Sequence, residues 1–234
     1  MKLYIVATPI GNLEDITLRA LRVLKEVDFV LCEDTRVTRI LLDKYEIKTP
    51  TISYFQHSKF SKINQIIDLL KSGKNLALVS DAGTPGISDP GNKLIEQVIG
   101  VLSNRVEVIP IPGANAAISA LSISGLPTDK FVFYGFLPHK KGKETILKEI
   151  INNKFTSVFY ESTHRILKTL NKLKDLGLDK HVVVCRELTK KFETVYRGNI
   201  QDVLSELEKG VTKGEFVVVV GTCHGELSRT MTRE

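Results

Sequence analysis

The chain has 234 residues, of which 42% are hydrophobic and 26% charged, a balance typical of folded proteins that bury a sizeable core. Its formal net charge of +6 favours a polyanionic partner. No apolar run approaches the roughly 20 residues that a bilayer-spanning helix needs, and the first apolar run, in MKLYIVATPIGN, lacks the cleavage pattern of a signal peptide. We therefore expect a cytoplasmic protein without a membrane segment.

The cysteines exclude a disulfide framework. Cys32, Cys185 and Cys223 are far apart in the sequence and odd in number, as is typical of reduced thiols. Cys223 and His224 come closest to the short spacing of metal ligands, but no second pair accompanies them. We predict no metal site.

In the first half of the chain, strand-like runs alternate with segments of helical spacing. The predicted strands are 3–7, 28–33, 75–79 and 106–111. Helical apolar spacing follows them at 16–27, 37–45, 63–70, 94–99 and 112–124. Asp15 is placed to cap the first helix, and Gly73 to stop the third. This alternation predicts a mostly parallel sheet with helices on both faces.

A break at 125–130 separates a second set of elements. Its predicted strands are 131–136, 156–161, 181–188, 193–200 and 215–222, with helices from 144 to about 153 and around Ile166–Leu173. Short connectors between neighbouring strands predict a sheet of mixed direction. We therefore expect two α/β domains, 1–126 and 127–224, followed by a polar tail, 225–234.

Three loops rich in glycine and proline follow strands of the first domain, at 8–12, 80–91 and 112–116. Ligands gather at the carboxyl ends of parallel strands, so three such loops favour a binding site over plain turns. The sequence has neither a G-x-x-x-x-G-K-[ST] loop nor a G-x-G-x-x-G loop after the first strand. The longest loop, SDAGTPGISDPG, carries no lysine or arginine, which favours a ligand without phosphates, such as S-adenosylmethionine.

Several motifs together resemble one known family. They are TPIGNLEDIT, CEDTR, LVSDAGTPGISDPG, IPGANAAISALSISGLPTDKFVFYGFLP, VFYESTHRI, CRELTKKFET and GEFVVVVG. They resemble the tetrapyrrole methylase superfamily and, within it, the branch of ribosomal RNA small subunit methyltransferase I. The resemblance implies two α/β domains with S-adenosylmethionine in the cleft between them, usually in a homodimer. It also implies methylation of the ribose 2′-hydroxyl of a cytidine in the decoding region of small-subunit (16S) ribosomal RNA.

The resemblance also implies a set of donor-binding residues. From the first domain they are Pro9, Gly83, Thr84, Pro85, Ile87, Asn115 and Ala116. From the second they are Tyr160, Glu161, Leu188, Glu215 and Phe216, although Tyr160 and Phe216 could equally be core residues. Thr84 stands where tetrapyrrole-modifying relatives usually have aspartate, which suggests a different acceptor.

Transfer of a methyl group to a hydroxyl is helped by a general base. Asp81 is the first candidate, because it lies in the expected donor loop, with Glu33, Asp34 and Glu161 as alternatives. Asp34 could instead form a structural ion pair with Arg36, and water or the RNA could take the proton.

Basic residues on loops near strand ends are candidates for RNA contacts. They are Arg36, Arg39, Lys140, Lys141, Lys143 and Arg165, with His139, Lys190 and Lys191 nearby in the sequence. A solvated charged surface is the alternative for such runs. Two other functions stay open: a C-methyltransferase acting on a tetrapyrrole or corrin precursor, and a non-enzymatic RNA-binding module.

Overall fold

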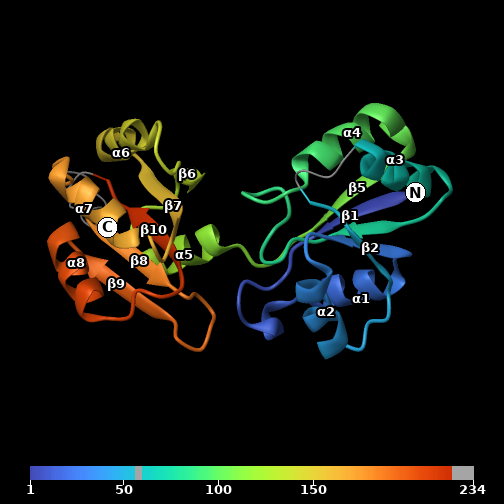
Figure 1. Cartoon of the computed structure of the whole chain (residues 1–234), viewed down its shortest axis with the longest axis horizontal. Helices are drawn as coiled ribbons and strands as arrows, with labels where there is room; N and C mark the ends of the chain where they lie inside the picture. The colour runs from blue at the N-terminus through green and yellow to red at the C-terminus, as the bar shows by residue number, and fades with distance from the viewer. Residues whose placement is uncertain (56–59, 223–234) are drawn as a thin grey trace, which may run out of the picture. The chain divides into compact units, whose positions relative to one another are not determined.

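A computed structural model describes residues 1–55 and 60–222 of the chain (Figure 1). It divides the chain into two compact units, the first Met1–Asn115 and the second beginning at Ala116. Cys223 and His224, and the predicted tail at 225–234, lie outside the described residues.

The first unit is built on a five-stranded sheet of order β3-β2-β4-β1-β5. Its strands are β1 (Lys2–Val6), β2 (Phe29–Cys32), β3 (Thr51–Ser53), β4 (Leu76–Leu78) and β5 (Glu107–Ile111). Every pairing is parallel, as predicted. The edge strand β3 was not predicted, because three residues are too short to show a periodic pattern.

Helices cover both faces of this sheet (Figure 1). Residues from α1 (Leu18–Glu26) and α2 (Thr35–Lys44) pack in one core, and residues from α3 (Phe60–Lys71) and α4 (Asn92–Leu102) in the other. Neighbouring strand residues point to opposite faces, so Val30 enters the first core and Leu31 the second. Two short 3₁₀ helices, η1 (Leu13–Asp15) and η2 (Ser103–Arg105), complete the unit.

The predicted cap of α1 is wrong. Asp15 lies within η1, and the N-cap is Thr17, whose hydroxyl accepts a hydrogen bond from the backbone N–H of Ala20 at 3.1 Å. Because Asp15 belongs to the 3₁₀ turn, the helix begins two residues later than predicted, at Leu18.

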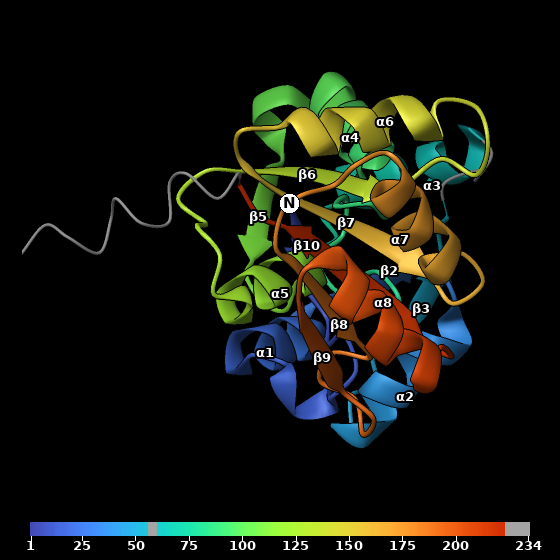
Figure 2. The ribbon, with the colours of Figure 1, turned by 90° about the vertical axis from the view of Figure 1, so that its left-hand side faces the viewer.

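The second unit contains a five-stranded mixed sheet of order β6-β7-β10-β8-β9. Its strands are β6 (Phe131–Phe136), β7 (Thr156–Ser162), β8 (Val182–Arg186), β9 (Thr194–Gly198) and β10 (Glu215–Val220). Only the β6–β7 pairing is parallel. Helices α6 (Lys143–Asn152), α7 (Ile166–Asp175) and α8 (Ile200–Lys209) contribute side chains to one core over this sheet (Figure 2). The predicted fold class, two α/β domains, is confirmed, although α8 was not predicted.

Helix α5 (Ala116–Ser124) belongs to the second unit, so the division falls 11 residues before the predicted boundary at 126. The helix packs on β10 and β7. Two hydrogen bonds also attach it: the Ala117 N–H donates to the Tyr160 hydroxyl at 3.2 Å, and Arg197 donates to the Ile123 carbonyl at 2.8 Å.

Candidate functional site

The three loops of the first unit meet at the carboxyl edge of the parallel sheet, as predicted. Thr8 and Gly83 form an antiparallel bridge, in which each N–H donates to the other's carbonyl at 2.9 and 3.0 Å. The Thr84 hydroxyl donates to the Ala114 carbonyl at 3.1 Å. The loop after β4 is therefore tied to the loop after β1 on one side and to the loop after β5 on the other.

Glycine is required at two positions of this arrangement. Gly83 has φ +83°, a left-handed conformation that a side chain strains. Gly113 approaches so closely that an added Cβ would lie 2.9 Å from the Ala7 Cβ. The glycines thus let three backbones approach closely enough to be hydrogen-bonded to one another at the sheet edge.

The predicted donor residues of this unit share the same loops. Pro9, Gly83 and Pro85 are buried, Thr84, Asn115 and Ala116 are half-buried, and the side chain of Ile87 is exposed. The loops that carry them meet at the sheet edge.

Acidic side chains gather beside these loops. Glu33 follows β2, Asp34 caps α2, and Asp81 and Asp89 lie in the loop after β4. Asp81 is exposed, and its carboxylate accepts a hydrogen bond from the Asp34 N–H at 3.1 Å. This bond links the predicted base to the N-terminus of α2.

Two of these carboxyls are shifted toward the protonated form. Burial, followed by the charges of Asp89 and Asp81, raises the pKa of Glu33 to about 7. Burial also raises the pKa of Asp89 to about 6, with a smaller contribution from Asp81. Asp34 behaves oppositely, because hydrogen bonds from Arg36 lower its pKa to about 2.

The raised pKa of Glu33 was not visible in the sequence, because it depends on burial in the fold and on the charge of Asp89, a residue 56 positions away. The one available signal was the aspartate pair within SDAGTPGISDPG. A carboxyl that titrates near neutral pH is suited to accept a proton during catalysis.

In the second unit, predicted donor residues lie on several strands. Tyr160 is half-buried on β7, and the rings of Phe133 and Phe136 meet its ring edge-on, with centroids 5.1 and 5.2 Å apart. Leu188 is buried, and Phe216 is part of the core over α6, α7 and α8. Phe216 is therefore a core residue, which is one of the two roles that the sequence allowed for it.

Glu161 has a role that the sequence did not predict. Its side chain is 0% exposed, and its carboxylate lies 2.7 Å from Arg165 Nε and 3.2 Å from Lys143 Nζ. The Thr169 hydroxyl also lies 2.7 Å from it. Lys143 and Arg165, both predicted to bind RNA, instead neutralise this buried carboxylate.

These ion pairs anchor the basic loop 137–142 at both ends. Arg165 donates to the Leu137 carbonyl at 2.9 Å, and Lys143 is the first residue of α6. Between these anchors, His139, Lys140 and Lys141 are exposed. Pairing with distant carboxylates is invisible to sequence periodicity, so the sequence does not separate Lys143 and Arg165 from Lys140 and Lys141.

The remaining predicted RNA contacts are at the surface of α2. Arg36 forms a two-pronged ion pair with Asp34, with its shortest distance 2.7 Å. Arg39 lies 3.5 Å from Asp43 on the same helix. Exposed pairs of this kind are weak, so both cations remain accessible to a phosphate.

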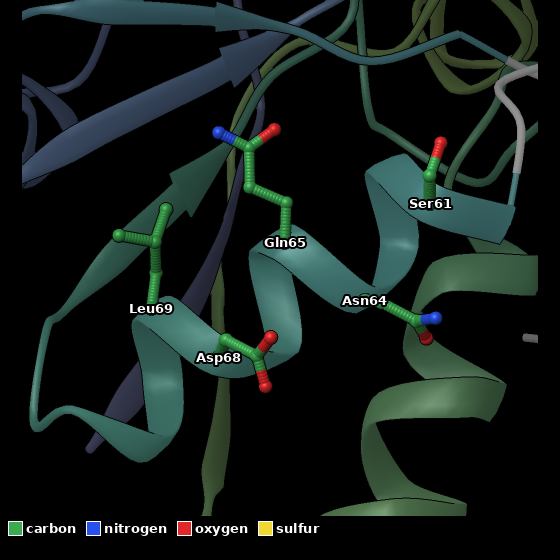
Figure 3. A pocket seen from close by; sticks show the side chains of 5 residues that line it. All are labelled: Ser61, Asn64, Gln65, Asp68 and Leu69. Atoms are coloured by element: carbon green, nitrogen blue, oxygen red, sulfur yellow. The ribbon is translucent and has the colours of Figure 1, made fainter.

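An open hollow in the surface of the first unit lies on α3. Ser61, Asn64, Gln65, Asp68 and Leu69 line it, and Figure 3 shows their side chains projecting from a single helix. A hollow formed by one helix face lacks the converging polar groups of a ligand site. We assign it no function.

Among residues 1–55 and 60–222, no cluster of His, Cys, Asp or Glu could hold a metal ion. Within the same residues, no helix is long and apolar enough to cross a membrane.

Comparisons with known proteins identify the family. The family model of the tetrapyrrole (corrin/porphyrin) methylases matches residues 2–204. The chain belongs to the tetrapyrrole methylase family. A Halalkalibacterium halodurans protein named ribosomal RNA small subunit methyltransferase I is 48% identical over 219 residues, 93% of this chain and 75% of that protein. A Thermotoga maritima protein of the same name is 45% identical, covering 94% of this chain and 97% of that protein.

Solved structures of the family share the fold. The chain aligns with the X-ray structure of cobalt precorrin-4 methyltransferase with a TM-score of 0.68 and 19% identity, covering 94% of each chain. It aligns with the crystal structure of diphthine synthase with a TM-score of 0.72 and 15% identity, covering 94% and 90%. At these identities the likeness concerns the fold alone.

Proposed function

We propose that this chain is an S-adenosylmethionine-dependent methyltransferase that modifies small-subunit ribosomal RNA, at the ribose 2′-hydroxyl of a cytidine. The observation that carries the proposal is the 45–48% identity, over nearly the whole chain, to proteins named ribosomal RNA small subunit methyltransferase I. The ribose 2′-hydroxyl of a cytidine is what the resemblance of the motifs to this branch implies. The net charge of +6 and the exposed lysines of loop 137–142 suit a polyanionic acceptor.

The residues of the first unit fit the proposed donor. S-adenosylmethionine carries a positive sulfonium and brings an activated methyl group to the acceptor. Glu33, Asp81 and Asp89 give this edge of the sheet a negative field, and the loop 80–91 contains no cation that would repel the donor.

The chain's own residues then have two tasks. The loops hold donor and acceptor in line, which converts a bimolecular reaction into an oriented one. A carboxylate takes the proton that the ribose hydroxyl releases as its oxygen bonds to the methyl carbon and the bond from that carbon to sulfur breaks, which leaves S-adenosylhomocysteine. Asp81 remains our first candidate, and Glu33 is the alternative favoured by its pKa of about 7.

The proposal is tested with a labelled donor. The purified protein is incubated with radiolabelled S-adenosylmethionine and small ribosomal subunits from cells that lack the gene. We expect label in the ribosomal RNA, at a ribose that resists alkaline cleavage on its 3′ side. Label in a corrin precursor instead would support the rival C-methyltransferase, and RNA binding without any donor binding would support the binding module.

The resemblance also implies a cytoplasmic homodimer. We retain both as part of the proposal, and light scattering of the purified protein tests the dimer.

A further inference from the structure

An aromatic side chain is held out into solvent by the loop that joins β8 to β9, residues 187–193. Phe192 is 65% exposed, and the ammonium of Lys191 lies 5.6 Å from the centroid of its ring. The loop also leaves Lys191 itself exposed.

The exposure of Phe192 is not a consequence of a loosely held loop. Arg186 is buried, and its guanidinium donates to the Phe192 carbonyl at 3.0 Å and to the Lys213 carbonyl at 2.8 Å. At the start of the loop, the Glu187 N–H donates to the Glu215 carbonyl at 2.9 Å. A buried cation thus fixes the backbone at the position from which the ring projects.

The backbone of the loop is also strained. Glu187 and Thr189 have φ of 52° and 64°, in the left-handed region that side chains disfavour. A β-branched residue is rare there, and such conformations persist where surrounding contacts enforce them. In this loop the strained backbone holds the ring of Phe192 in water, so the ring contributes little buried apolar surface to the stability of the folded chain.

The two lysines of the loop differ in whether their charges are paired. Lys190 lies 2.9 Å from the carboxylate of Glu187 and 2.8 Å from that of Glu215, so its charge is neutralised within the unit. Among the described residues, no carboxylate forms an ion pair with Lys191. Glu193, also exposed, accepts a hydrogen bond from the Thr189 N–H within the loop. The loop therefore offers one aromatic face and one adjacent cation, with its remaining charges engaged inside the unit.

The strand register brings this loop to the same end of the sheet as the basic loop 137–142. Phe136, the last residue of β6, pairs with Tyr160 of β7. The next residue of β7 is Glu161. It pairs with the same residue of β10 as Arg186, the last residue of β8. Both loops leave the sheet here. Lys140 and Lys141 thus add positive charge at the end of the sheet from which Phe192 projects.

We propose that Phe192 stacks on an unpaired base of the RNA substrate while Lys191 contacts a neighbouring phosphate. An aromatic face beside a cation is the combination by which proteins bind single-stranded nucleic acid. The proposal rests on the proposed function. It adds a contact whose strength depends on the presence of a base, in addition to the contacts that depend on the charge of the RNA phosphates.

The test compares two RNA probes. One is a fluorescently labelled single-stranded oligonucleotide with the decoding-region sequence, and the other has the same length but an abasic central segment. Wild-type protein should bind the intact probe more tightly. Phe192→Ala should weaken this binding by about 5- to 100-fold, the range that base–aromatic stacking gives, and bind both probes alike.

Three variants separate stacking from other causes. Phe192→Tyr should retain the preference for the intact probe, whereas Phe192→Leu, which is apolar but has no ring, should lose it. Phe131→Ala is the matched control, because Phe131 is a partly exposed phenylalanine (38%) at the opposite end of β6. It should bind like the wild type.

Other results would overturn the stacking contact. Equal binding by wild type and Phe192→Ala would remove it, and wild-type affinity of Phe192→Leu would indicate a plain apolar contact, such as one with a protein partner. A wild type that binds neither probe also overturns it. The proposed function is judged separately, by labelling of small ribosomal subunits, and survives any of these results if that labelling occurs.

Discussion

Arg165 Nε lies 2.7 Å from the carboxylate of Glu161, whose side chain has no contact with solvent. Lys143 completes the pair from the start of α6 at 3.2 Å. Glu161 lies near the end of β7, Lys143 is the first residue of α6, and Arg165 directly precedes α7 and donates to the chain just after β6. Their ion pairs therefore connect the ends of the two strands to the starts of the two helices. This arrangement makes the stability of the second unit depend on a residue that the sequence assigned to the donor site.

We therefore expect Glu161→Gln to destabilise the protein by about 1–3 kcal/mol, because it removes the counter-charge of two partly buried cations. Chemical denaturation measures the change. Glu144→Gln is the control: Glu144 also pairs with two lysines, Lys148 and Lys172, but at the surface, so its free energy of unfolding should stay close to that of the wild type. If Glu161→Gln is as stable as this control and instead loses donor affinity, Glu161 contacts the donor.

Gly83 should be needed for donor binding. Gly83→Val adds a branched side chain where the three loops converge, and we expect S-adenosylmethionine binding to be lost in calorimetry while the fold is retained. Gly73→Val is a matched control, because Gly73 also has a positive φ (+88°) but has nothing within 4 Å of an added Cβ. The two variants share the backbone strain, so unchanged donor affinity in Gly83→Val would remove this loop from the donor site.

Lys140 and Lys141 should contribute electrostatic affinity for RNA. Replacing both by alanine should flatten the dependence of log K on log salt by roughly one unit for each lost phosphate contact, with donor binding unaffected. Lys148→Ala provides the control, because this exposed lysine is paired with Glu144 on the same helix. A salt slope that does not change in the double variant would mean that loop 137–142 faces solvent only.

Stability should decrease with pH through the titration of Glu33. Its pKa is raised from 4.5 to about 7 in the folded protein, so the folded state keeps a proton that the unfolded state releases. The resulting stabilisation is complete below pH about 4.5 and is lost as pH rises to about 7. Glu33→Gln should be less sensitive to pH over this window in denaturation experiments. An unchanged pH dependence would contradict the raised pKa.

Local pattern predicted most of the fold but not the pairings between distant residues. The stripe of Ile63, Ile66, Ile67 and Leu70 is buried under α3 as expected, because helical spacing is a local property. By contrast, α5 is apolar on all sides, so its sequence does not indicate which sheet it packs on. Its hydrogen bond to Tyr160 decides the question, and only the folded chain contains it.

The same distinction applies to the site. The three loops were predictable, because parallel strands bring their carboxyl ends to one edge. The partners of each charge were not. Glu161 and Asp81 read alike in the sequence, yet one is buried between two cations and the other is exposed beside Glu33. The two cations that pair with Glu161, and not its position in the sequence, mark it as a structural carboxylate.

The identity of the base is tested by two isosteric variants. Asp81→Asn keeps the shape of the side chain but removes its basicity. If Asp81 is the base, both ligands should bind almost normally while the single-turnover rate falls by ~10²–10⁴. Glu33→Gln should then retain most of the rate.

The pH dependence of the rate distinguishes the two carboxyls further. If Glu33 is the base instead, the wild-type rate should rise with pH through about 7, where its carboxyl loses its proton, and Glu33→Gln should abolish that rise. Asp81→Asn should shift the rise to lower pH, because the negative charge of Asp81 contributes to the raised pKa of Glu33. Rates within a few-fold of wild type in both variants would exclude both residues as the base. Orientation of donor and acceptor would then account for the rate, with water or the RNA taking the proton.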